Sequence, residues 1–161
     1  MATSTYLKID PIKGESTDTK HKDWIEVTNF EHGLSQPMSG PSGTGGRAAS
    51  RADFDTFTVE KLVDTATPDL NQYCAQGKHI AKLELEVCQE TGEKVNYLKY
   101  EMENVMVKSV AITGAGSDRP AESVEFVFDK IGWEYTAVKN DGAAGTKVGP
   151  KKWNLQENKP E

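Results

Sequence analysis

The chain has 161 residues, a formal net charge of −6 and 36% hydrophobic residues, which fits one domain with an economical core. The acidic balance excludes nucleic acid as the main partner, because a nucleic-acid binder needs a basic stripe. No apolar run reaches the length of a membrane helix, so we expect no membrane insertion.

Short alternating segments at the N-terminus predict β-strands with one buried face. Two such strands are expected at Tyr6–Asp10, with Leu7 and Ile9 inward, and at Trp24–Phe30. The first residues lack a basic region followed by an apolar run. We therefore expect synthesis in a cytoplasm without a cleaved signal peptide.

Composition changes abruptly between Pro37 and Ala52, where Gly, Ser and Pro dominate. Such a segment is expected to form neither helix nor sheet, and a loop of this length in a compact domain is usually functional or disordered. It is not a phosphate-binding loop, because no Gly-Lys-Ser/Thr follows it and no helix opens after it. Phe54–Lys61 is then predicted as a strand, with Phe57 and Val59 inward.

One segment carries the start and stop signals of a helix, at about residues 68–76. Thr67 precedes a proline and is predicted as the N-cap, Pro68 suits the first helical position, and Gly77 suits the left-handed end. A helix this short needs a partner. Its apolar face is expected to pack on the sheet through Leu70, Tyr73 and Cys74.

The C-terminal half again alternates. A hairpin is predicted from Ile80–Cys88 and Val95–Met102, and separate strands at Asn104–Ile112 and Glu122–Phe128. After Phe128, the residues expected to face the core change from even-numbered to odd-numbered positions. These are Ile131, Trp133 and Tyr135, and the change indicates a bulge. The whole pattern predicts one all-β domain over residues 1–161, a compact β-barrel of two packed antiparallel sheets with one flanking helix and a long Gly-rich loop.

Catalytic chemistry is not indicated. Cys74 and Cys88 are expected to be buried free thiols. The three histidines, His21, His32 and His79, are scattered, and none has a second ligand at metal-site spacing along the chain. No carboxylate pair is singled out, although any two could meet in space. We expect no enzyme, no catalytic or metal site and no cofactor.

Several motifs, taken in order, resemble the Hcp family, the haemolysin-coregulated tube proteins of the bacterial type VI secretion system. They are Tyr6-Leu7-Lys8-Ile9, Lys13-Gly14-Glu15-Ser16, His21, Ile25-Glu26-Val27, Gly33-Leu34-Ser35-Gln36, Phe57-Thr58-Val59-Glu60-Lys61, Asp64, Thr67-Pro68-Asp69-Leu70, Gly77-Lys78-His79, Tyr97-Leu98 and Trp153-Asn154-Leu155. Pro37, Pro41, Arg47 and Arg51 depart from the plainer Gly/Ser runs of that family's loop.

The resemblance implies homohexameric rings that stack into an inner tube, which a contracting sheath expels beneath a spike protein. Effector proteins would ride in the lumen, and the protein would leave the cell for the extracellular space or a target cell. The implied ring-to-ring contact is the Gly-rich loop, through Gln36, Ser39, Gly40, Gly43, Gly45, Gly46 and Arg47. Candidate contacts between subunits are Gly14, Glu15, Ser16, Asn71, Gln72 and Gln76. For Gly14–Ser16, a simple turn is an equal alternative to a contact between subunits. For the Gly-rich loop, plain disorder is the alternative to a ring-to-ring contact.

Two other functions stay open from sequence. A phage or phage-like tail tube protein would polymerise in a similar way. A β-barrel module that binds a small molecule or glycan would need a concave aromatic site. Trp24, Trp133 and Trp153 fall on separate segments and are interpreted as core or interface anchors instead.

Overall fold

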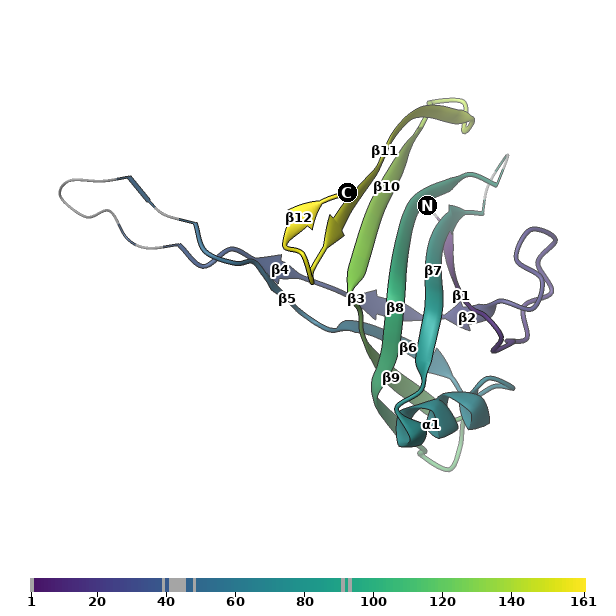
Figure 1. Ribbon diagram of the computed structural model, residues 1–161. Helices are drawn as coiled ribbons and strands as arrows, with labels where there is room; N and C mark the ends of the chain where they lie inside the picture. The colour runs from purple at the N-terminus through teal and green to yellow at the C-terminus, as the bar shows by residue number, and fades with distance from the viewer. Residues whose placement is uncertain (1, 39, 41–45, 48, 91, 93) are drawn as a thin grey trace.

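The computed structural model describes residues 2–38, 40, 46–47, 49–90, 92 and 94–161. Its single α-helix in these ranges is α1, Thr67–Gln76. The strands are β1 Thr3–Ile9, β2 Ile25–Val27, β3 Asn29–Glu31, β4 Leu34–Ser35, β5 Asp53–Phe54, β6 Phe57–Leu62, β7 His79–Gln89, β8 Asn96–Thr113, β9 Ala121–Val127, β10 Lys130–Val138, β11 Ala144–Asn154 and β12 Lys159–Pro160. The predicted all-β class with one short helix is confirmed (Figure 1).

Ten of the strands form one antiparallel sheet whose main path runs β12-β11-β10-β8-β7-β1-β2. A branch leaves β8 through β9 and β6 to β3. The predicted strand Trp24–Phe30 is interrupted at Thr28, whose N–H and hydroxyl both donate to the carbonyl oxygen of Glu60, at 2.8 and 2.9 Å. The chain therefore changes partner there, from β1 to β6. Closure of the sheet into a barrel stays a prediction.

Strand β8 joins the two parts of the sheet. One edge pairs with β7, while the other edge pairs first with β10 and then, from Met106 onward, with β9. The expectation of two strands divided near Asn104 was wrong. Asn104 has a positive φ of 52°, yet the strand continues through it, so the residue marks the change of neighbour rather than an end.

The core lies between the strand faces that the alternation of apolar and polar residues predicted to be buried. Leu7, Ile9, Phe57 and Val59 are fully buried, as are Leu83 and Leu85 of β7 and Val124 and Phe126 of β9. The inward assignment of Tyr135 was wrong, because its side chain is 51% exposed. It pairs with Val148, also exposed, toward the end of the β10–β11 ladder that extends away from the core (Figure 1).

Helix α1 closes one end of the sheet beside β7, β8 and β9 (Figure 1). Leu70 and Tyr73 are buried, whereas Cys74 is half-buried. Gly77 ends the helix in the predicted left-handed conformation, with φ 63°, and both cysteines are free thiols. None of the described helical residues belongs to a helix with the length and apolarity to cross a bilayer.

Thr67 is not the N-cap, which is Ala66. Its hydroxyl instead donates to the carboxylate of Glu122 at 2.7 Å. The same carboxylate lies 2.8 Å from the ammonium of Lys61, which is 1% exposed and also 2.8 Å from Asp64. This buried cluster connects the start of the helix to the β6–β9 ladder. Lys61 and Glu122 are cross-strand partners in that ladder.

The Gly-rich segment begins and ends in a narrow ribbon, and we call the described residues between 34 and 54 the arm. Strands β4 and β5 pair with each other on either side of the Pro37–Ala52 segment, and inside it Met38 bridges Ala49, so the expectation of no sheet there was wrong only at this bridge. The arm leads away from the body of the protein (Figure 1). Near its base, the Arg51 guanidinium donates to the carbonyl oxygen of Leu155.

Candidate assembly surfaces

The loop before β2, residues 13–24, is folded against the start of that strand. The N–H of Gly14 donates to the Asp23 carbonyl at 2.8 Å, and the N–H of Ser16 donates to the Trp24 carbonyl at 3.0 Å. A Cβ at Gly14 would lie 2.4 Å from the Trp24 oxygen, so only glycine permits this approach. Ser16 is buried, which leaves Glu15 as the exposed side chain of the three candidate residues.

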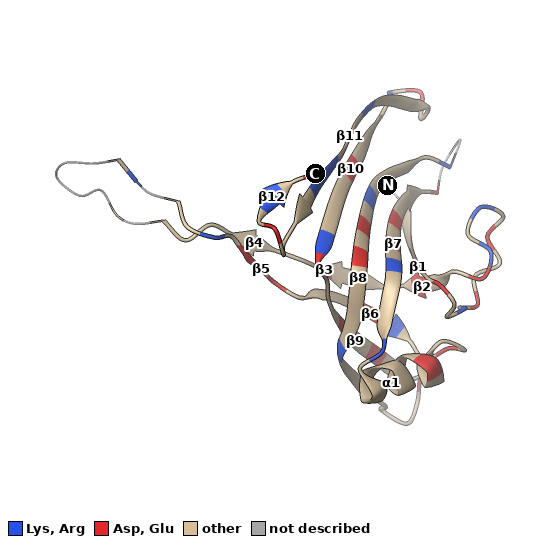
Figure 2. Cartoon of the chain, viewed as in Figure 1, with Lys and Arg blue, Asp and Glu red and all other residues tan. Residues whose placement is uncertain are grey.

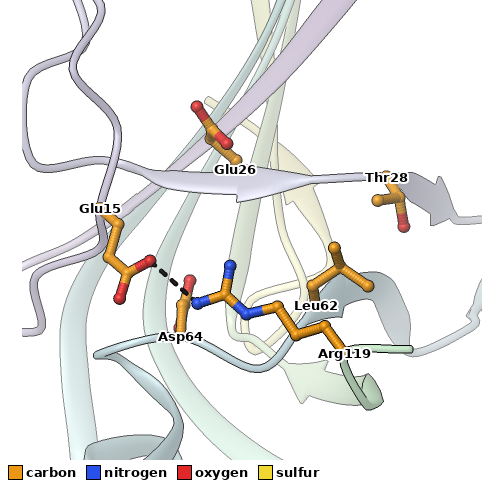
Figure 3. Close-up of a pocket in the computed structure, with 6 residues that line it drawn as sticks. All are labelled: Glu15, Glu26, Thr28, Leu62, Asp64 and Arg119. Atoms are coloured by element: carbon orange, nitrogen blue, oxygen red, sulfur yellow. Dashed lines mark hydrogen bonds and ion pairs between the residues drawn. The ribbon is translucent and has the colours of Figure 1, made fainter. Parts of the chain in front are cut away.

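Glu15 points toward Arg119, from the loop before β9, across a small hollow of about 90 Å³ (Figure 3). The carboxylate and guanidinium are 3.3 Å apart, and both side chains are largely exposed. The rest of the hollow is lined by Glu26, Thr28, Leu62 and Asp64. An exposed pair of this kind adds little to the stability of its own chain. Because both side chains are largely exposed, they are accessible to another molecule.

The arm presents its predicted contact residues to solvent. Gln36, Gly40, Gly46 and Arg47 are exposed, and the Gln36 side-chain oxygen accepts from the Ser50 N–H at 3.0 Å. Ser39, Gly43 and Gly45 lie outside the described residues. Sequence reasoning missed two apolar side chains on the arm, Leu34 and Met38, which are 52% and 59% exposed. Both side chains are available for a contact with another chain.

The polar face of helix α1 is solvent-exposed as predicted. Asn71, Gln72 and Gln76 are all exposed. The Asn71 amide donates to the Thr67 carbonyl at 3.0 Å, so this donor is already used within the helix. Gln72 and Gln76 lie one turn apart and are both exposed, so they form the more accessible pair.

Charged residues of both signs are interspersed along β7 and β8 (Figure 2), and on β7 they alternate with buried ones, which places them on the face away from the core. Lys82 lies 2.5 Å from Glu101 and 3.1 Å from Glu84. Lys99 lies 3.7 Å from both Glu84 and Glu86. The opposite charges of these pairs cancel one another. This face is therefore hydrated and has no strong electrostatic potential of one sign.

His21 lies in the loop of residues 13–24, as expected, but the expectation that it stands apart from other ligand groups was wrong. It is 2% exposed and stacks on Tyr6 with ring centroids 4.3 Å apart. Its Nδ1 lies 2.7 Å from Asp18 and its Nε2 lies 2.6 Å from Glu86 on β7. Glu86 is 65 residues away in the chain, so no local spacing could have revealed the cluster.

Asp18 gives this cluster a defined pH dependence. The Lys94 ammonium, and less strongly the His21 ring, hold the pKa of Asp18 at about 2, below its ordinary 3.8, against the opposing effect of desolvation. A carboxylate with a depressed pKa stabilises the folded state above the unfolded pKa, and that contribution is lost as pH falls from about 4 to 2.

We therefore expect Asp18→Asn to lower the free energy of unfolding by about 1–2 kcal/mol at pH 7. The difference from wild type should shrink toward zero between pH 4 and pH 2 in urea unfolding. Asp10→Asn is the control, because Asp10 is 83% exposed and sits 3.9 Å from Lys8. A difference for Asp18→Asn that stays constant down to pH 2 would contradict the assignment.

Comparisons with known proteins match this chain to one family. Residues 6–135 match the family described as "Type VI secretion system effector, Hcp". Protein hcp1 of Pseudomonas aeruginosa is 35% identical over 98% of both chains. A solved structure described as a type six secretion system protein superposes with a TM-score of 0.95 at 40% identity, over 99% of this chain and 100% of the other. Hcp1 from Salmonella typhimurium gives 0.80 at 28% identity, over the full length of both chains.

Proposed function

Because the chain belongs to the Hcp family of type VI secretion proteins, we propose that it is a structural tube subunit rather than an enzyme. In this proposal six copies form a ring, and rings stack into the inner tube that a sheath expels beneath a spike protein. Effector proteins travel in the lumen, and the subunit itself is exported from the cell. The observation that carries the proposal is the end-to-end match to an Hcp protein, at 98% coverage of both chains.

The surfaces of the single chain support assembly. A ring needs two different patches on each subunit that meet head to tail, and stacked rings need a further contact along the axis. The exposed pair Glu15 and Arg119 and the exposed residues Gln72 and Gln76 lie on the body and fit lateral contacts. The projecting arm, with exposed Leu34, fits the axial contact.

The ring is tested by the mass of the protein in solution. Native mass spectrometry or light scattering should give six times the 17.7 kDa of one chain. A monomer that persists at high concentration would overturn the proposal.

The axial role of the arm is tested by deleting residues 39–46. The deletion leaves two residues between the bridged pair Met38 and Ala49, which is the length of a tight hairpin loop. We expect hexamers, at six times the mass of the shortened chain, and a loss of tube formation, seen by electron microscopy or sedimentation. A Gly-Ser linker of equal length is the control that separates the sequence of this segment from its length. If the deletion variant fails to form hexamers, the segment belongs to the lateral contact instead.

A further inference from the structure

One cluster of potential metal ligands joins the loop of residues 13–24 to β7, and the proposed assembly does not use it. Within the described ranges, His21, Glu86 and Cys88 place a ring nitrogen, a carboxylate oxygen and a sulfur within 4.8 Å of one another. His21 Nε2 is 2.6 Å from the Glu86 carboxylate and 3.7 Å from the Cys88 sulfur. His21 and Cys88 are buried, and the Glu86 side chain is 15% exposed, so solvent reaches the cluster along that carboxylate.

The other ring nitrogen of His21 is already committed. Its Nδ1 lies 2.7 Å from Asp18, and a carboxylate in that position holds the Nδ1 proton and orients the ring, as in many metal sites. A neutral imidazole has only one ring proton. The Nε2 lone pair then faces the Glu86 carboxylate, and this contact is favourable only with a second proton or a cation between the two groups.

We propose that His21, Glu86 and Cys88 bind a divalent transition-metal ion of the zinc class, with Asp18 as the carboxylate that positions His21. Imidazole, thiolate and carboxylate are the donors that zinc takes in proteins, and three protein ligands leave a fourth position for water.

The distances fit with a small adjustment. Tetrahedral zinc with bonds of about 2.0–2.3 Å needs donor atoms about 3.3–3.6 Å apart. The separation between Nε2 and Sγ already meets this within 0.2 Å or so. The separation between Nε2 and the Glu86 oxygen must open by about 0.7 Å, which a rotation of the partly exposed Glu86 side chain supplies.

Metal binding also displaces a proton. The entering dication occupies the position between Nε2 and Glu86, and the proton of the Cys88 thiol leaves to solvent. Burial, followed by the Glu86 carboxylate, raises the pKa of the Cys88 thiol to about 11, so the metal has to displace that proton and binding weakens as pH falls.

Metal binding would tie the loop of residues 13–24 to β7 across 65 residues of sequence. A ligand that binds only the folded state raises stability by mass action, about 2.7 kcal/mol at a hundred times its dissociation constant. The proposed site therefore stabilises the loop that carries Glu15, independently of whether rings form.

The test uses the full-length protein without an affinity tag, stripped by a chelator and then titrated with Co²⁺ and Zn²⁺. We expect one ion per chain, and with Co²⁺ a near-ultraviolet thiolate-to-cobalt absorption band that excess Zn²⁺ removes. Cys88→Ala should abolish the band. Cys74→Ala should retain it, because Cys74 lies on helix α1 outside the cluster. Absence of the band, or a band that survives Cys88→Ala, would overturn the proposal.

A second readout covers variants that fold poorly. The thermal midpoint of wild type and of Cys74→Ala should rise with Zn²⁺, whereas that of Glu86→Gln and Cys88→Ala should not change. Circular dichroism of each stripped variant confirms that it is folded before metal is added. An equal rise in all four proteins would mean that Zn²⁺ binds elsewhere and would contradict the assignment.

Discussion

Replacing Lys61 with alanine is expected to lower the free energy of unfolding by about 3–5 kcal/mol. The change removes the cation that lies 2.8 Å from both Glu122 and Asp64, and it leaves these carboxylates buried without a counter-charge. One oxygen of Glu122 already has no hydrogen-bond partner among the described residues. Urea unfolding monitored by tryptophan fluorescence measures the loss.

Lys82→Ala is the matched control. Lys82 also contacts two carboxylates, at 2.5 and 3.1 Å, but its side chain is 50% exposed. We expect a change of at most about 1 kcal/mol, because solvent screens the pair. A double change, Lys61→Met with Glu122→Leu, should recover part of the stability by removing both buried charges. Equal losses for Lys61→Ala and Lys82→Ala would show that burial does not decide the effect.

Gly14→Ala is expected to cost about 1–3 kcal/mol, the usual range for forcing an atom into a packed site. The new Cβ would lie 2.4 Å from the Trp24 carbonyl oxygen and 2.6 Å from the Ile25 Cα, and both are backbone atoms that cannot turn aside. Relief requires the loop to separate from β2. Thermal unfolding measures the cost, and faster amide exchange at Ser16 would locate it.

The control for Gly14 is the same substitution on the arm. A Cβ at Gly40 or Gly46 would meet nothing within 4 Å, so alanine there should change stability by less than about 0.5 kcal/mol. If Gly14→Ala is as stable as these controls, the close approach of the loop to β2 does not persist in solution.

Alternation along the sequence located buried faces wherever a second layer covers the strand. Leu83, Leu85 and Val87 were predicted inward and are buried. The same rule failed at Tyr135, because the β10–β11 ladder continues beyond the layer that would cover it. Period-two patterning reports which residues share a face and not whether anything packs on that face.

Long-range polar contacts were beyond prediction. Thr67 has the local signals of an N-cap, but the Glu122 carboxylate, 55 residues later, takes its hydroxyl. His21 likewise meets residues on β7 that no spacing rule connects to it. The exposed positions of α1 followed from helical periodicity, whereas contacts between copies depend on surfaces that a single chain does not bring together.

The pairing of β1 with β7 constrains the order in which the chain can fold. Strand β1 is synthesised first, but its longest ladder, from Thr3–Gln89 to Ile9–Leu83, needs a strand made after the arm and the helix. Until β7 exists, β1 can pair only with the short strand β2, over Thr5–Leu7. Strands β7, β8 and β9 are neighbours both in sequence and in the sheet, and such local pairings form fastest. We therefore expect this meander to form first and the N-terminal strand to join it last, which leaves β1 exposed to other chains during synthesis.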